Sequence, residues 1–66
     1  MRVRTDEAAD ALYIRLDESA IVESEEVSPG VVLDFDESGR VVGIEILNVH
    51  QRLPAANLKR VEVELA

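Results

Sequence analysis

Residues 31–47, VVLDFDESGRVVGIEIL, constrain the fold of this chain more than any other stretch. Two alternating runs rich in β-branched residues flank a Ser38-Gly39 turn signal, which is typical of a β-hairpin. With a two-residue turn at Ser38-Gly39, the large apolar residues form these cross-strand pairs: Phe35 with Val42, Leu33 with Ile44 and Val31 with Ile46. A four-residue loop over 37–40 keeps the same parity. One face of the hairpin is therefore predicted to be apolar and the other mixed.

The remaining strands are predicted from alternation. Residues 2–5 and 11–16 form a second hairpin, for which a single helical turn over the loop 6–10 is an alternative conformation. Asp6 is expected to bond backbone amides two or three residues further on. The acidic segment 17–28 is interpreted as a connection with a short edge strand at 21–25, and Ser28-Pro29-Gly30 as the turn before the central hairpin. Residues 61–65, VEVEL, read as a last strand.

The pattern changes after Leu47, where a short helical segment over 48–60 is predicted. Asn48 is a suitable N-cap residue, and Gln51 stands at the position that completes a capping box. Pro54 disfavours the α region at Leu53, so the segment should be kinked there into two short turns.

These elements predict one α+β domain over residues 1–66. Its antiparallel sheet has four or five strands, namely two β-hairpins plus a C-terminal strand, near 2–5, 11–16, 31–36, 41–47 and 61–65. The short, kinked helical segment lies on the apolar face of this sheet. The expected core is Val3, Leu12, Ile14, Leu16, Leu33, Phe35, Val42, Ile44, Ile46, Leu53 and Leu58.

So short a chain buries only about 60% of the surface that its unfolded form exposes. Since cysteine is absent, neither a disulfide nor a Cys-based metal or redox site is available. We therefore expect a homodimer, because association enlarges the buried area and the uncovered sheet face carries apolar side chains: Ala11, Tyr13, Val32, Val41 and Leu47. The alternative interface is pairing of the final strand across the twofold axis. Without an apolar run of membrane-spanning length or a signal-peptide pattern, we expect no membrane association and a cytoplasmic location.

Charge is distributed unevenly. Eight acidic residues and no basic one lie between Arg15 and Arg40, within a chain of net charge −7. Arg52, Lys59 and Arg60 are too few to contact nucleic acid convincingly, so no nucleic-acid partner is expected for the protomer. Acidic surface often serves only solubility, and the more specific alternative is a small basic protein partner.

No catalytic or cofactor-binding motif is present, and we expect neither enzyme activity nor a cofactor. The spacing of Asp34, Asp36, Ser38 and Glu45 matches an EF-hand calcium loop, but the flanking runs are strands where such a loop requires helices. In the hairpin, Asp34, Asp36 and Glu45 share one face and are the candidate ligands for a divalent cation. The single histidine, His50, is expected at the surface, and Tyr13 on the mixed face beside Val32.

Residues 9–14 (ADALYI) and 30–47, followed by a helix-capping residue and Arg52-Leu53-Pro54, resemble domain-of-unknown-function family 2283. The resemblance implies a small prokaryotic α+β domain of unassigned activity, some relatives of which are thought to sit beside small toxin-like proteins. Thr5-Asp6-Glu7 stands where relatives often have Tyr-Asp-Pro.

Two functions remain open. The chain is expected to be a non-catalytic protein-interaction module, antitoxin-like toward a small basic partner. The alternative is a carboxylate-based or divalent-metal-dependent enzyme with a site formed between subunits.

Overall fold

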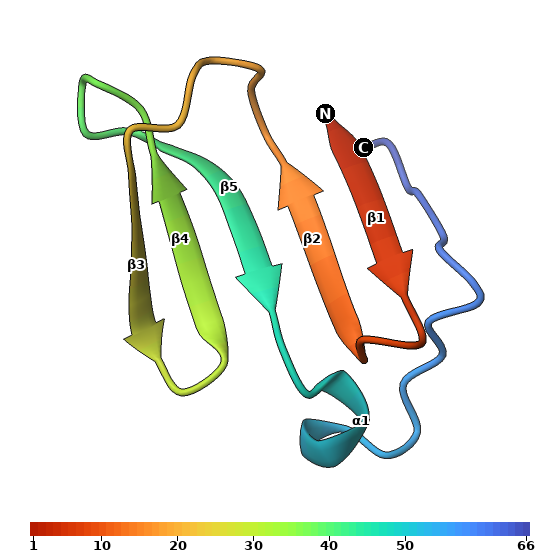
Figure 1. Cartoon of the computed structure of the whole chain (residues 1–66). Helices are drawn as coiled ribbons and strands as arrows, with labels where there is room; N and C mark the ends of the chain where they lie inside the picture. The colour runs from red at the N-terminus through yellow and green to blue at the C-terminus, as the bar shows by residue number, and fades with distance from the viewer.

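Two hairpins supply most of the sheet in the computed structural model, which describes all 66 residues (Figure 1). Strand β1 (Arg2–Asp6) pairs with β2 (Ala11–Arg15), and β4 (Val31–Phe35) pairs with β5 (Val41–Ile46). A further strand, β3 (Glu23–Ser28), pairs with β4. The order is β1-β2-β5-β4-β3 with every pair antiparallel, so β5 lies in the centre. The predicted α+β fold class is confirmed.

The central hairpin keeps its predicted pairs Val31–Ile46 and Leu33–Ile44. Beyond Asp34 the register shifts, so that Phe35 faces Val41 and Val42 is an extra residue on β5. The predicted Phe35–Val42 pair and the two-residue turn are therefore wrong. Instead, the Asp36 amide donates to the Arg40 carbonyl and the Gly39 amide to the Asp36 carbonyl, which gives a longer loop with Gly39 at φ 76°. A bulge of one residue compensates for this odd loop length and keeps the apolar face continuous.

Strand β3 is the fifth strand of the sheet. The predicted edge strand at 21–25 exists but is shifted to Glu23–Ser28, because the Pro29-Gly30 turn brings this segment beside β4. Gly30 has a φ of 76°, and a type II turn requires a positive φ at this position and often has proline before it. All residues of β3 are exposed.

The first hairpin closes as the sequence predicts. Its loop lies between Asp6 and Ala11, and the Asp6 carboxylate accepts the Ala9 amide at 3.0 Å. Asp10 then adopts a left-handed backbone conformation with φ 53°.

Helix α1 (Val49–Arg52) is a single turn at the end of β5. The predicted capping box is absent, because Asn48 has a left-handed conformation and its side chain makes no capping bond. The cap comes from Asp10, whose carbonyl accepts the Val49 amide and whose carboxylate accepts the His50 amide, both at 3.0 Å. No helix in the structure has the length and apolarity needed to cross a membrane.

The second helical turn and the C-terminal strand are not formed. The helix ends at Arg52 because Leu53 precedes Pro54 and has an extended backbone (φ −132°). Residues 61–65 have no regular secondary structure. The tail runs back alongside β1, and the two termini lie close together (Figure 1). The helical segment predicted over 48–60 is thus a single helical turn followed by irregular chain.

The core is small. Val42, Val49 and Leu58 are buried, and Val42 is only 2% exposed. Most other predicted core residues are half-buried: Leu12, Ile14, Leu33, Phe35, Ile44 and Ile46. Val3, Leu16 and Leu53 are exposed, contrary to prediction. Val3 lies on an edge strand, Leu16 follows the end of β2, and Leu53 follows the end of α1. The radius of gyration is 12.7 Å, whereas about 11 Å is typical of a compact domain of this length.

Val42 should therefore contribute more to stability than its size suggests. Replacing Val42 with Ala removes two buried methyl groups and should lower the free energy of unfolding by about 2 kcal/mol. Val22→Ala, at a position that is 62% exposed, is the matched control and should change it little. Urea unfolding monitored by circular dichroism measures both. Equal midpoints for the two variants would contradict the placement of the core.

Candidate functional site

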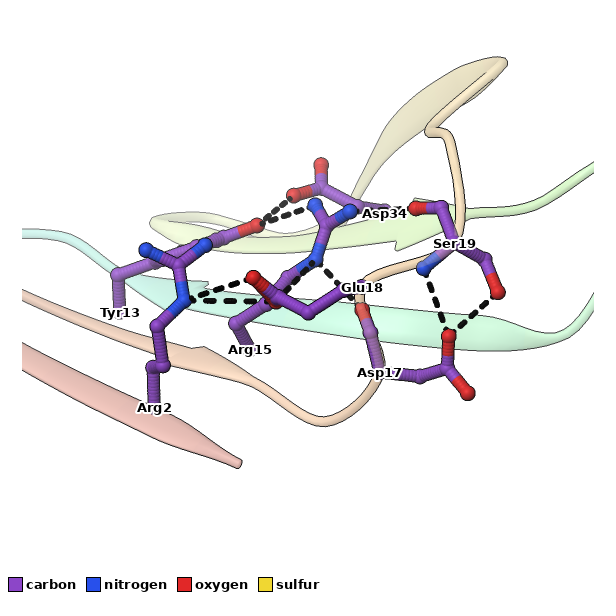
Figure 2. A network of polar contacts seen from close by, with 7 residues as sticks. All are labelled: Arg2, Tyr13, Arg15, Asp17, Glu18, Ser19 and Asp34. Atoms are coloured by element: carbon purple, nitrogen blue, oxygen red, sulfur yellow. Dashed lines mark hydrogen bonds and ion pairs between the residues drawn. The ribbon is translucent and has the colours of Figure 1, made fainter.

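The mixed face of the sheet carries a connected polar network (Figure 2). The Tyr13 hydroxyl donates to Asp34 Oδ2 at 2.7 Å, and the Ser24 hydroxyl donates to Asp34 Oδ1 at 2.5 Å. Asp34 is 9% exposed. A carboxylate in such a position is costly unless its oxygens accept hydrogen bonds, and here both do. The network therefore ties β2, β3 and β4 together across one face.

Gly43 makes this contact possible. In the register of the sheet it stands between Arg15 on β2 and Asp34 on β4. A Cβ atom at Gly43 would lie 2.5 Å from the Tyr13 hydroxyl oxygen and 2.8 Å from Asp34 Oδ2. Glycine at this position of β5 therefore leaves the space through which Tyr13 reaches Asp34.

Arg15 joins the network to the acidic connection that follows β2. Its Nη1 donates to the Tyr13 hydroxyl at 3.4 Å, Nε donates to the Asp17 carbonyl at 2.6 Å, and Nη2 donates to the Ser19 carbonyl. Glu18 lies between Arg15 and Arg2, at 3.6 Å and 3.0 Å (Figure 2). The Ser19 hydroxyl and amide both donate to Asp17, and these bonds, the hydroxyl first, lower the pKa of the Asp17 carboxyl. These residues serve to order the loop.

A shallow hollow of about 490 Å³ opens beside the network. Its charged lining residues are Arg4, Asp6, Asp34 and Glu45. Tyr13, Ala9, Ala11 and Leu47 complete the wall. Asp34 and Glu45, two of the three candidate metal ligands, are thus brought together.

Asp36, the third candidate, lies elsewhere. It lines a separate hollow with Ser19, Val22 and Arg40. Its carboxylate accepts the Arg40 amide at 2.9 Å, the Ser38 amide at 2.9 Å and Arg40 Nε at 2.8 Å. The predicted three-carboxylate patch is therefore not formed. The bulge at Val42 and the longer loop place the Asp36 carboxylate against the backbone of its own turn, away from Asp34 and Glu45. No group of three or more potential ligand side chains in the structure is placed to hold a metal ion.

His50 is exposed, as predicted, and both ring nitrogens contact groups of this chain. Nδ1 lies 2.7 Å from an Asp10 carboxylate oxygen, and Nε2 lies 2.8 Å from the Ala56 carbonyl oxygen. Asp10 and His50 together connect the first loop, helix α1 and the tail. The ring therefore has a structural position. Tyr13 is on the mixed face, as predicted, but Glu45 separates it from Val32 in the register.

The two edges of the sheet carry opposite charge. β3 has Glu23 and Glu25 opposite apolar residues of β4, and Glu26 opposite Val32 on the other face. β1 presents Arg2 and Arg4. Both strands are terminal in the sheet order, so neither pairs with another strand on its outer side.

The model of a family described as "Protein of unknown function (DUF2283)" matches residues 2–50. The chain belongs to this family. The match spans all five strands, the Asp34 network and the acidic edge, whereas most of the tail lies beyond it. The region that matches DUF2283 thus contains the whole sheet with its polar face. Searches of the curated proteins and of the solved structures found no significant match.

The polar network of this DUF2283 protein was missed from the sequence. Parity places Tyr13, Asp34 and Glu45 on the mixed face, but only the adjacency of β2 and β5 brings Tyr13 to Asp34. Gly43, a glycine inside a strand, was the available signal, because such a residue often marks the close approach of another group.

Tyr13→Phe tests the network. The variant keeps the ring but leaves Asp34 Oδ2 without a donor, so we expect a loss of about 1–3 kcal/mol in the free energy of unfolding. Gly43→Ala should cost at least as much, because its Cβ cannot be accommodated without moving Tyr13. Thermal melts of both variants beside the wild type measure this. An unchanged melt for Tyr13→Phe would show that the hydrogen bond does not contribute.

The hydrogen bonds to the Asp36 carboxylate predict that the free energy of unfolding depends on pH. Hydrogen bonds from the Arg40 amide first, and then from the Arg40 side chain and the Ser38 amide, lower the pKa of the Asp36 carboxyl despite its desolvation. A lowered folded-state pKa stabilises the fold at pH values above the unfolded value of about 3.9, and this stabilisation is lost as pH falls through the folded value. Asp36→Asn should therefore melt below the wild type at neutral pH, with the gap closing below about pH 4.

The control for this prediction is Glu37→Gln. It removes the same charge from an exposed neighbour that accepts none of these bonds, so its melting temperature should follow the wild type. A gap for Asp36→Asn that stays constant down to acid pH would contradict the role given to the Asp36 carboxylate.

Proposed function

We propose that this protein is a non-catalytic binding module for a basic protein partner and that β3 is the strand that the partner contacts. The supporting observation is the state of this strand, which is exposed along its whole length and terminal in the sheet. An edge strand offers unpaired backbone amides and carbonyls to an added strand, which is a common mode of peptide recognition.

The charge on β3 determines which strand can be added. Glu23 and Glu25 stand on the face of Leu33 and Phe35, and Glu26 stands on the opposite face. Pairing two copies of β3 brings like charges together and is unfavourable, which is how many proteins protect an edge. The same charges attract an extended segment with lysine or arginine on both faces. The edge thus disfavours self-association and favours a basic partner.

The rest of the molecule adds to this selectivity. With a net charge of −7, the chain attracts cationic proteins and speeds their encounter at low ionic strength. Sequestration of a small basic protein, in the manner of an antitoxin, is the simplest biological form of such binding.

An enzyme is the less favoured alternative. Both oxygens of Asp34 already accept hydrogen bonds from Tyr13 and Ser24, and Asp36 is bound within its own turn. The carboxylates of this face thus stabilise the sheet, and the hollow beside them is open and shallow.

The test uses as the probe a short synthetic peptide of lysine and valine whose lysines fall on both faces of the extended chain. We expect saturable binding at low salt, weakened by added salt, with the largest amide shifts in NMR spectra confined to 23–28. Changing Glu23, Glu25 and Glu26 to Gln should weaken binding about tenfold, because three exposed ion pairs of roughly 0.5 kcal/mol each are lost.

A second variant distinguishes binding at the β3 edge from a general effect of the net charge. Glu7, Glu18 and Glu37 are exposed acids outside β3, and changing all three to Gln alters the net charge equally. This control should bind the peptide nearly as well as the wild type. If both triple variants weaken binding alike, or if the amide shifts spread over the whole surface, β3 is not the docking strand and the proposal fails.

A further inference from the structure

The C-terminal segment has the pattern of a strand but no strand partner. Residues 61–65 alternate apolar and acidic side chains, and no backbone hydrogen bond joins this segment to the sheet. Val61, Val63 and Leu65 are 50%, 71% and 92% exposed. An amphipathic strand left unpaired in a single chain is a segment that another sheet edge can complete.

The segment lies near β1 in its own chain but not in position to pair. A hollow of about 540 Å³ separates the tail from the sheet. Val61 and Val63 line one side, and the apolar side chains of Val3, Leu12 and Ile14 line the other. Leu58, which is buried, holds the start of the segment beside this apolar face. The tail therefore lies alongside β1 without a backbone hydrogen bond to it, so the hydrogen-bonding edge of β1 stays unpaired.

The side chains of the two segments complement each other in one antiparallel register. Aligning Val63 with Val3 gives these cross-strand pairs: Glu62 with Arg4, Glu64 with Arg2, Val61 with Thr5 and Leu65 with Met1. Every acid meets a base on the polar face, and every apolar residue of the segment falls on the apolar face. Such cross-strand pairs stabilise a sheet by about 0.2–1 kcal/mol each.

Neighbouring registers are worse. A shift of two residues one way sets Arg60 against Arg4, and a shift the other way sets Glu62 against Asp6. A shift of one residue exchanges the two faces. Arg4 is 79% exposed along its side chain, with only Asp6 nearby at 3.9 Å, so its guanidinium is available to a further carboxylate.

We propose that two copies of this chain form a homodimer by reciprocal strand exchange, each adding its residues 61–65 to the β1 edge of the other. Exchange across a twofold axis satisfies both edges and closes the assembly. Direct pairing of two β1 strands over their full length is less favourable, because that register sets Arg4 against Arg4. The β3 edges stay free, so this dimer is independent of the binding function proposed above.

Engineered cysteines test the register, since the chain has none of its own. Val3→Cys and Val63→Cys chains, one isotopically labelled, are mixed and oxidised mildly. We expect a disulfide between unlike chains at twice the 7.3 kDa chain mass, identified by mass spectrometry. Glu64→Cys replaces Val63→Cys in the control, because its side chain falls on the opposite face, and it should give little of this product.

The double variant Val3→Cys/Val63→Cys determines which chain supplies the strand. Exchange predicts bridges between chains. A bridge formed within single chains would assign the segment to its own β1 edge and overturn the proposal, as would the absence of any Val3–Val63 bridge.

Charge reversal supplies a readout that does not depend on cysteine chemistry. Glu62→Arg/Glu64→Arg should raise the dimer dissociation constant at least about tenfold in sedimentation equilibrium, since reciprocal ion pairs become repulsive. Adding Arg2→Glu/Arg4→Glu to the same chain should restore association. A wild type that remains monomeric at millimolar concentration, or a dimer insensitive to the reversal, would overturn the proposal.

Discussion

The central position of β5 is the constraint on which the rest of the structure depends. This strand pairs with β4 on one side and β2 on the other, so it joins two hairpins that are separate in the sequence into one sheet. Its side chains serve both faces. Val42 is the most buried apolar residue of the chain, and Gly43 leaves room for the contact between Tyr13 and Asp34. Backbone pairing at the centre therefore creates both the small core and the polar network.

A single sheet with one helical turn cannot enclose many side chains. Polar contacts therefore join the loops and the helix to the sheet where apolar packing is absent. Asp10 caps α1 from the first hairpin loop. Arg52 donates to the Leu47 and Pro29 carbonyls and so fastens α1 to the turn between β3 and β4. Arg15 orders the acidic connection. The contacts of Asp10 with α1 and of Arg52 with Pro29 join segments far apart in the sequence. A charged side chain with satisfied partners restricts the chain to one arrangement.

The two edges of this sheet are chemically different, which is the physical basis for assigning them different partners. Acidic β3 repels a copy of itself and suits a basic strand, whereas β1 carries arginines that suit the acidic segment of a second copy. A one-layer domain offers little concave surface but two strand edges, so edge pairing is its natural means of association. The match to DUF2283 covers the sheet and not most of the tail.

The sequence by itself determined the two hairpins, the parity of their faces, the Pro29-Gly30 turn and the α+β class, because alternation and turn chemistry are local properties. It could not determine the bulge at Val42, since loop length and register are settled together by pairing across β4 and β5. The cap of α1 also came from outside the helix, because Asp10 reaches it only after β2 has docked on β5. Tertiary structure likewise decided the Asp34 network and separated Asp36 from Asp34 and Glu45. Residues 61–65 likewise could not be assigned from the sequence alone. Their alternation specifies which face is apolar, but a strand forms only where the edge of a sheet pairs with it.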